Sequence, residues 1–230
     1  MFMFEIDYVQ LKNLFDVKLA LESLPFLLQG VPATLLLSFI GMGLGLALGF
    51  ILALARGSER IILRWPARMY ISFMRGTPMI VFLFLLYFGL PIIGIELSSF
   101  TAASLAFGLN SAAYIAEINR ASLNSIDGGQ WESAKALNIP YWSTMRTIIL
   151  PQAVRIAIPP LTNVFLSVVK STSLAAIITV PELFQKAQIV AGRTFDSMTM
   201  YILVALIYWP ICLAISVMQD RLEARYSKYV

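Results

Sequence analysis

The sequence predicts an all-α integral membrane fold with five transmembrane helices, the N-terminus outside and the C-terminus in the cytoplasm. The composition, the spacing of apolar runs and the distribution of basic residues predict this fold. Of the 230 residues, 59% are hydrophobic and only 13% are charged, whereas a soluble domain is about half apolar and about a quarter charged. So little charge cannot cover a surface that faces water. We therefore expect one membrane domain over residues 1–230.

Five apolar runs reach the length of about 20 residues that a helix needs to cross the hydrocarbon core. They cover residues 24–55, 71–90, 99–119, 160–179 and 198–218. The first run is overlong, so we expect its opening turns, around Gly30, to follow the membrane surface. The Pro159-Pro160 pair marks the entry into the fourth run. Residues 1–23 carry charges of both signs and predict an interfacial segment rather than a cleavable signal peptide.

The distribution of basic residues sets the orientation. With the N-terminus outside, four basic residues fall outside and twelve fall in the cytoplasm, which is the side that the positive-inside rule favours. The twelve are Arg56, Arg60, Arg64, Arg68, Arg75, Arg120, Lys135, Arg146, Arg155, Arg221, Arg225 and Lys228. This orientation places residues 120–159 in the cytoplasm.

Residues 120–159 form a polar interval with a structure of its own. Asp127-Gly128-Gly129 is a turn signal, and residues 130–137 predict a short helix. Asn138 suits a left-handed C-cap, where glycine is the best residue and asparagine the second. Residues 141–150 predict a second short helix, which we expect Pro151 to end.

The spacing in this interval resembles the EAA motif of bacterial ABC-importer permeases: Glu-Ala-Ala, three residues, Gly, nine residues, Ile, one residue, Leu-Pro. The matching residues are Glu132, Ser133, Ala134, Asn138, Ile148, Leu150 and Pro151. Ser133 stands for the second alanine and Asn138 for the glycine. Three further blocks resemble permeases of polar amino acid importers of the histidine, glutamine, arginine and cystine type. They are Arg75-Gly76-Thr77-Pro78 with residues 87–91, then residues 109–117, and then residues 170–174 with Val180-Pro181-Glu182-Leu183.

The resemblance implies the permease subunit of an ATP-driven importer in the bacterial cytoplasmic (inner) membrane. The helix with Glu132 and Lys135 is then the coupling helix, which docks on a separate ATPase subunit. The resemblance also implies two copies of that ATPase, a second permease subunit in a homodimer or a heterodimer, and an external solute-binding protein. ATP and Mg²⁺ are expected on the ATPase.

The chain itself has no P-loop, no histidine and one cysteine, Cys212. We therefore expect no catalytic residue, no metal site and no cofactor in this chain. The positive charge is expected to reflect cytoplasmic loops in contact with lipid headgroups rather than a surface for nucleic acid.

Lys170 falls about ten residues into the fourth run, or roughly 15 Å along a helix, close to the membrane midplane. A lysine there usually faces a bundle interior or a watery cavity. Asn110, Ser111 and Tyr114 come to a similar depth from the third run, and Ser171 and Thr172 adjoin the lysine. This set is either a polar substrate pocket, in which Lys170 meets a carboxylate, or a structural network that joins the third run to the fourth.

No Asp or Glu lies deep in a predicted span. This absence favours a neutral or zwitterionic amino acid as substrate, with L-cystine as one candidate. Basic or acidic amino acids are the alternative, and an ATP-independent channel or carrier is a more distant one.

Three smaller features complete the predictions. Arg75, Thr77 and Pro78 are expected to gate or anchor the cytoplasmic mouth of the second run. Small residues at four-residue spacing are expected to pack one helix closely within the subunit; they are Gly41, Gly45 and Gly49. Glu117 and Arg120 are spaced for a salt bridge along one helix.

Overall fold

The computed structural model describes residues 14–226, and every regular element in that part of the chain is helical. The α-helices are α2 Val17–Leu28, α3 Val31–Gly57, α4 Ile61–Gly76, α5 Met79–Phe84, α6 Ser99–Asn124, α7 Gly128–Ala136, α8 Tyr141–Thr144, α9 Leu150–Ser171, α10 Leu183–Thr194 and α11 Ser197–Tyr226. The π-helical turns are η1 Leu85–Gly89 and η3 Met145–Ile149, and the 3₁₀ segments are η2 Leu90–Ile93 and η4 Thr172–Ile178. The predicted interfacial segment falls largely outside these residues.

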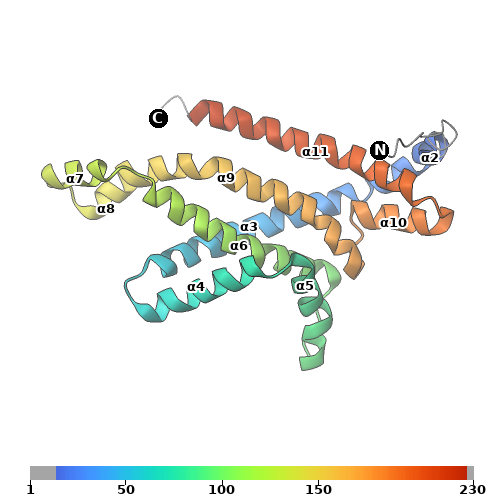
Figure 1. The fold of residues 1–230 in the computed structure, drawn as a ribbon, viewed down its shortest axis with the longest axis horizontal. Helices are drawn as coiled ribbons and strands as arrows, with labels where there is room; N and C mark the ends of the chain where they lie inside the picture. The colour runs from blue at the N-terminus through green and yellow to red at the C-terminus, as the bar shows by residue number, and fades with distance from the viewer. Residues whose placement is uncertain (1–13, 227–230) are drawn as a thin grey trace, which may run out of the picture.

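The molecule is elongated, with α7 and α8 at one end and α2 and α10 at the other (Figure 1). Helix α6 lies at its centre, because α6 contacts α3, α4 and α9. Fully buried residues lie on several sides of α6, among them Phe107, Ala112 and Ile115. A helix that is covered on all sides needs less apolar surface than one facing lipid, and α6 accordingly carries serine and asparagine side chains.

Three helical stretches within the described residues are long and apolar enough to cross a membrane: Val31–Gly57, Tyr141–Ile178 and Ser197–Arg221. A fourth span arises if Ile61–Gly76 and Met79–Ile93, which meet at 106°, are one broken crossing. Helix α6 is 26 residues long but is not among these stretches. The helical membrane fold therefore agrees with the sequence, while the count of five spans and their orientation stay predictions.

The glycine face of α3 packs against α6, which confirms the expected close contact within the subunit. A Cβ added at Gly41 would lie 2.8 Å from the Cβ of Phe107, and one at Gly49 would lie 2.7 Å from Ile115. At Gly45 an added Cβ would collide with the hydroxyl of Ser111. Only the absence of side chains lets the two backbones approach this closely.

The prediction of one continuous helix over residues 71–90 is wrong. Helix α4 ends at Gly76, and the chain turns by 106° before α5 begins. Thr77 has an extended backbone, with φ −111° and ψ 136°. The reason is Pro78, whose ring excludes the preceding residue from the helical region.

The predicted stop at Pro151 and the predicted helix start at Pro159-Pro160 are also wrong, because residues 141–178 form one stretch of helical turns. Before Pro151, the N–H of Leu150 donates to the carbonyl of Met145, five residues back. The same wide turn precedes Pro91, where Leu90 N–H donates to the carbonyl of Leu85. A π turn makes room for the proline ring, so the chain bends without leaving the helix.

The first apolar run divides into α2 and α3 at Gln29-Gly30, so its opening turns form a separate helix. Gly30 is required at this break, since an added Cβ would lie 2.6 Å from the backbone of Glu182. The close approach brings the start of α10 against the start of α3. At the other end of the chain, α11 continues past the predicted end at residue 218 to Tyr226.

Candidate functional site

The break between α4 and α5 opens a cavity of about 630 Å³ toward α6 and α9, which we call the central pocket. Its walls are Arg75, Gly76, Thr77, Pro78, Met79, Phe107, Asn110, Ser111, Tyr114, Pro160, Asn163, Val164, Ser167, Val168 and Ser171. The pocket thus brings together Asn110, Ser111, Tyr114 and Ser171 from the expected substrate pathway. It adds the expected gate, Arg75, Thr77 and Pro78, to the same wall.

A hydrogen bond from Asn110 stabilises the broken end of α4 at the pocket. Pro78 has no N–H, so the carbonyl of Met74 lacks its usual partner four residues on. The side-chain amide of Asn110 donates to that carbonyl at 2.8 Å. Tyr70 adds a second link, because its hydroxyl donates to the carbonyl of Leu109 at 2.8 Å. The pocket wall is therefore a hydrogen-bonded joint rather than a loose loop.

Ser111 serves packing as well as lining the pocket. Its hydroxyl lies within hydrogen-bonding distance of the carbonyl of Phe107, at 2.7 Å, and that of Gly41, at 3.1 Å. This contact joins α6 to the glycine face of α3. Ser111 thus has a structural role, but it joins the third predicted run to the first, whereas the structural alternative predicts a network between the third and fourth runs.

Of the residues that the structure describes, Arg75 is the one charged residue among the pocket walls. Its guanidinium group lies over the ring of Tyr114, 5.5 Å from the centroid, in a cation–π contact. Within residues 14–226, no acidic side chain lines the cavity. A ligand in the central pocket would therefore meet one positive charge, several hydroxyl and amide groups, and apolar walls.

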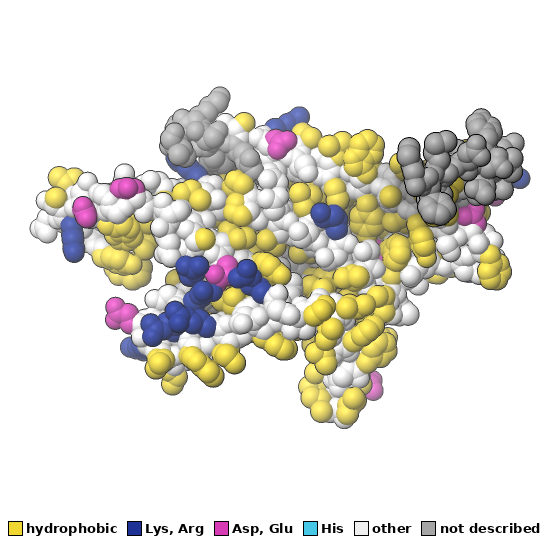
Figure 2. Space-filling model, viewed as in Figure 1, with side chains coloured by type: hydrophobic (Ala, Val, Ile, Leu, Met, Phe, Trp, Pro, Cys, Tyr) yellow, Lys and Arg dark blue, Asp and Glu magenta, His cyan; other side chains and the backbone are white. Residues whose placement is uncertain are grey.

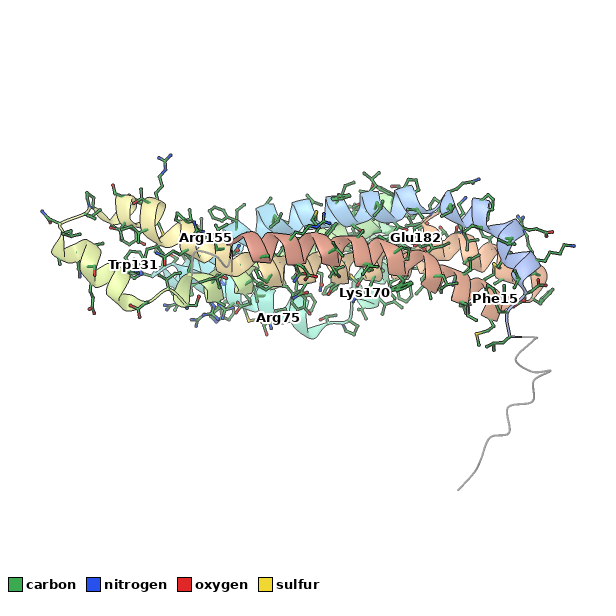
Figure 3. The ribbon with its side chains drawn as sticks, turned by 90° about the horizontal axis from the view of Figure 1, so that it is seen from above. Phe15, Arg75, Trp131, Arg155, Lys170 and Glu182 are labelled. Atoms are coloured by element: carbon green, nitrogen blue, oxygen red, sulfur yellow. The ribbon has the colours of Figure 1, made fainter. Side chains whose placement is uncertain are left out.

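Lys170 and Thr172 are not among the pocket walls. The side chain of Lys170 is exposed on the described chain, and Figure 3 shows it between Arg75 and Glu182 along the long axis. Thr172 is buried, and its hydroxyl donates to Val169 and pairs with Tyr208. The structure therefore separates Lys170 and Thr172 from the four pathway residues that line the pocket, and Arg75 holds the place expected for the lysine.

The expected coupling helix, α7, projects at one end of the molecule together with α8 (Figure 1). Asp127 caps it, because its carboxylate accepts a hydrogen bond from the N–H of Gly129 at 2.7 Å. Asn138 follows α7 with φ 55°, which confirms the expected left-handed cap. The ring of Trp131 stacks on that of Tyr141, with centroids 5.5 Å apart, and holds α7 beside α8.

The residues matching the EAA motif divide into an inner and an outer set. Ala134 is 3% exposed, and Ile148 packs against a small core that contains Ile149. The outer set is exposed and consists of Glu132, Ser133, Lys135, Asn138, Leu150 and Pro151. Leu137 and Trp142, at 74% and 78% exposure, add apolar surface beside them. Such a mixed charged and apolar tip is typical of a docking surface.

Glu182 falls in a block that resembles the family, but the sequence did not predict its burial; the carboxylate is 0% exposed although it lies between the candidate spans. Its side chain accepts hydrogen bonds from Tyr208 at 3.0 Å and from the N–H of Gln185 at 2.7 Å. Thr34 lies 3.4 Å away on α3. Glu182 caps α10 in the structure, but glutamate is not among the residues preferred at an N-cap, so no strong local signal marked this role.

The expected pair of Glu117 and Arg120 is confirmed at 3.2 Å. The structure adds Arg56, from the end of α3, to the same carboxylate. No local pattern could indicate this second partner, because 61 positions separate Arg56 from Glu117.

Comparison with known proteins gives a consistent result. The family described as binding-protein-dependent transport system inner membrane component matches residues 45–228. A probable amino-acid ABC transporter permease protein, YckA of Bacillus subtilis (strain 168), is 57% identical over 98% of this chain and 100% of its own length. The L-cystine transport system permease protein TcyB of the same organism is 42% identical over 90% of this chain and 88% of its own.

Solved structures show the same fold. A chain from an amino acid ABC transporter crystallised with histidines has a TM-score of 0.86 and 32% identity, covering 96% of this chain and 99% of that one. A chain of the MetNI methionine ABC transporter in an inward-facing conformation has a TM-score of 0.70 at 21% identity, covering 87% of this chain and 96% of that one. The second likeness concerns the fold alone.

Proposed function

Because the chain belongs to the family of binding-protein-dependent transport system inner membrane components and is a permease subunit of an amino acid ABC importer, we propose that its central pocket carries a neutral or zwitterionic amino acid. The observation that carries the proposal is the pocket's charge, one arginine and no carboxylate. Arg75 is placed to meet the α-carboxylate that every amino acid has. A cationic side chain would find no partner there.

L-cystine is our candidate substrate, since TcyB is named for it. ArtQ of Bacillus subtilis (strain 168), 34% identical, is named for arginine transport, and basic or acidic amino acids remain the alternative. The cavity of about 630 Å³ falls within the range of about 300–1,000 Å³ that small-molecule sites occupy.

We further propose that α7 couples the chain to ATP hydrolysis on a separate ATPase, with two copies in the assembly. ATP and Mg²⁺ belong to that subunit, and this chain is not an enzyme. Exposed Glu132 and Lys135 supply charges for docking, and Leu137 and Trp142 supply apolar contact. Asn138 holds the turn, and the leucine and proline at 150 and 151 begin the long helix that transmits force.

The proposed topology has five spans, with the N-terminus outside the cytoplasmic membrane of a bacterium. Helix α6 is then the central crossing, shielded from lipid by α3, α4 and α9. One such subunit needs a second permease, as a homodimer or a heterodimer, to enclose a pathway. An external solute-binding protein delivers the amino acid.

The substrate proposal is tested by ATP hydrolysis in reconstituted membranes that contain this chain, its ATPase and its binding protein. We expect L-cystine or another neutral amino acid to stimulate hydrolysis, and arginine to have little effect. Arg75→Gln is expected to lower the stimulation at limiting substrate by about tenfold, because a charge-assisted hydrogen bond contributes about 1.5–3 kcal/mol. Lys170→Met is the control outside the pocket.

If Arg75→Gln and Lys170→Met lost the stimulation of ATP hydrolysis equally, the assignment of the substrate to the central pocket would be wrong. Selective stimulation by arginine would overturn the substrate class while leaving the importer intact. Transport that continues without the ATPase would point to a channel or carrier.

The coupling proposal is tested by co-purification of the ATPase. Trp142→Ala combined with Glu132→Gln is expected to reduce the bound ATPase, since both side chains lie on the exposed tip. Trp65→Ala is the matched control, because Trp65 is 61% exposed on α4, away from the tip. If the control loses as much ATPase as the tip variant, α7 is not the docking element.

A further inference from the structure

Four arginines from three helices gather around one carboxylate where α3 ends beside α4 and α6. Glu117 pairs with Arg56 of α3 and with Arg120 of α6. Two more arginines, Arg68 and Arg75, come from α4 and share a cavity with Arg56. Figure 2 shows dark blue side chains gathered over this part of the molecule. One carboxylate among four guanidinium groups leaves the cluster with three net positive charges, and within the described residues neither Arg68 nor Arg75 pairs with an acidic side chain.

The cavity at this cluster, which we call the arginine pocket, measures about 390 Å³. Its walls are Arg56, Arg68, Ile71, Ser72 and Arg75. None of the acidic side chains that the structure describes lines it. Guanidinium groups present paired N–H donors whose geometry matches a phosphate group, and the hydroxyl of Ser72 adds a further donor. The lining therefore fits a phosphate-bearing anion better than a carboxylate alone.

The position of the arginine pocket on α4 indicates where that anion comes from. At 3.6 residues per turn, Arg68, Ser72 and Arg75 fall on one stripe of the helix. The stripe on one side is buried and contains Ala67 and Ile71. The stripe on the other side is apolar and exposed, and consists of Ile62 at 76%, Trp65 at 61%, Met69 at 54% and Phe73 at 55%.

An exposed apolar stripe directly beside an arginine stripe suits a ligand with a charged head and apolar chains. Tryptophan and arginine are also the side chains that gather at headgroup depth in membrane proteins. Figure 2 shows the hydrophobic side chains along the outer edge of α4, next to the basic group.

We propose that the arginine pocket binds the phosphate group of an anionic phospholipid, whose acyl chains lie along the apolar stripe of α4. Arg68 and Arg56 hold the phosphate, Arg56 while it stays paired with Glu117. Arg75 also lines the central pocket, so an occupied lipid site would bear on the wall of the substrate site. The proposal needs only the membrane setting and does not rest on the substrate assignment.

The test is native mass spectrometry of the full-length chain, purified in detergent with its co-expressed partner subunits and titrated with lipid. Phosphatidylglycerol is expected to bind at least tenfold more tightly than phosphatidylcholine, whose choline cancels the phosphate charge. Arg68→Gln is expected to weaken phosphatidylglycerol binding about tenfold, as a lost charge-assisted hydrogen bond does. Arg60→Gln removes the same charge from the start of α4, outside the pocket, and is expected to change little.

A second variant tests whether binding needs the space of the arginine pocket as well as its charge. Ser72→Leu keeps every arginine but fills the pocket, and it is expected to lower phosphatidylglycerol binding as Arg68→Gln does. A parallel titration uses inorganic phosphate in place of lipid. If inorganic phosphate binds and Arg68→Gln abolishes that binding, while phosphatidylglycerol binds no more tightly than phosphatidylcholine, the pocket binds free phosphate and the proposal of a lipid ligand is wrong. Equal losses in Arg68→Gln and Arg60→Gln, with no loss in Ser72→Leu, would overturn the site altogether.

Discussion

Asn138 carries a backbone conformation that few residues adopt without cost. With φ 55°, it turns the chain after α7 so that the aromatic rings of Trp131 and Tyr141 can stack. Asparagine tolerates this region because its short polar side chain does not crowd the backbone, and glycine tolerates it better. The turn that shapes the coupling tip is thus specified by one residue.

Replacing Asn138 tests this role. Asn138→Gly is expected to leave the unfolding free energy unchanged or slightly higher, whereas Asn138→Val is expected to lower it by about 1–2 kcal/mol. Thermal unfolding of the purified chain measures both, and ATPase co-purification reports on the tip. A valine variant as stable as the glycine variant would show that the left-handed turn is not under steric constraint.

Glu182 is a buried acid that joins α3, α10 and α11 through Thr34, the cap of α10 and Tyr208. Burial raises the pKa of its carboxyl above the ordinary 4.5, against the opposing effect of its hydrogen bonds. The folded chain therefore holds this proton more tightly than the unfolded chain. Its contribution to stability is fully present below pH 4.5 and declines as the pH rises toward the folded-state pKa.

Because the pKa of Glu182 is raised in the folded chain, the free energy of unfolding is expected to fall as the pH rises. Relative to Glu182→Gln, the wild-type chain is expected to lose stability as the pH rises above 4.5, by about 1.4 kcal/mol for each unit by which the pKa is raised. Thermal unfolding of both proteins between pH 4 and pH 8 gives the difference directly. A difference that grows with the opposite sign would mean that the hydrogen bonds outweigh burial.

The glycine face of α3 sets the distance between two helices, and α3 offers its own control for this claim. Gly45 faces the hydroxyl of Ser111, while an added Cβ at Gly43 would meet nothing within 4 Å. Gly45→Ala is expected to destabilise by about 1–3 kcal/mol through overpacking. Gly43→Ala is expected to be neutral or stabilising by about 0.5–1 kcal/mol, because alanine is the better helix former. Equal melting temperatures for the two variants would contradict this packing.

A proline ends the helix at one position of this chain and is accommodated within a helical stretch at others. Pro78 ends α4 and creates the wall of the central pocket, whereas Pro151 and Pro91 follow π turns and leave the chain helical. The difference lies in the turn before the ring. At Pro78 the residue before it is extended, and the free carbonyl of Met74 is satisfied from another helix, by Asn110.

The whole molecule places the coupling tip and the start of α11 at opposite ends (Figure 1). The proposed topology therefore predicts opposite labelling of two matched serines, both exposed, in a Cys212→Ser background. Ser143→Cys is expected to react with a membrane-impermeant maleimide only from the cytoplasmic side, and Ser197→Cys only from outside. Labelling of both from one side would rule out the five-span arrangement.

The sequence determined by itself the helical membrane class, the amino acid permease family, the glycine face of α3, the cap at Asn138 and the pair of Glu117 with Arg120. Each of these depends on neighbours within a few turns of one helix, or on the bulk cost of placing polar groups in hydrocarbon.

Only the tertiary structure decided which polar residues share a cavity. Arg75 replaced Lys170 at the central pocket because the bend at Pro78 carries the end of α4 over α6, and no local pattern encodes the angle of that bend. The hydrogen bonds of Glu182 and the ion pair of Arg56 with Glu117 likewise depend on helices that are far apart in the sequence. Helix periodicity fixes which face a residue occupies, but the partner of that face is chosen by how whole helices pack.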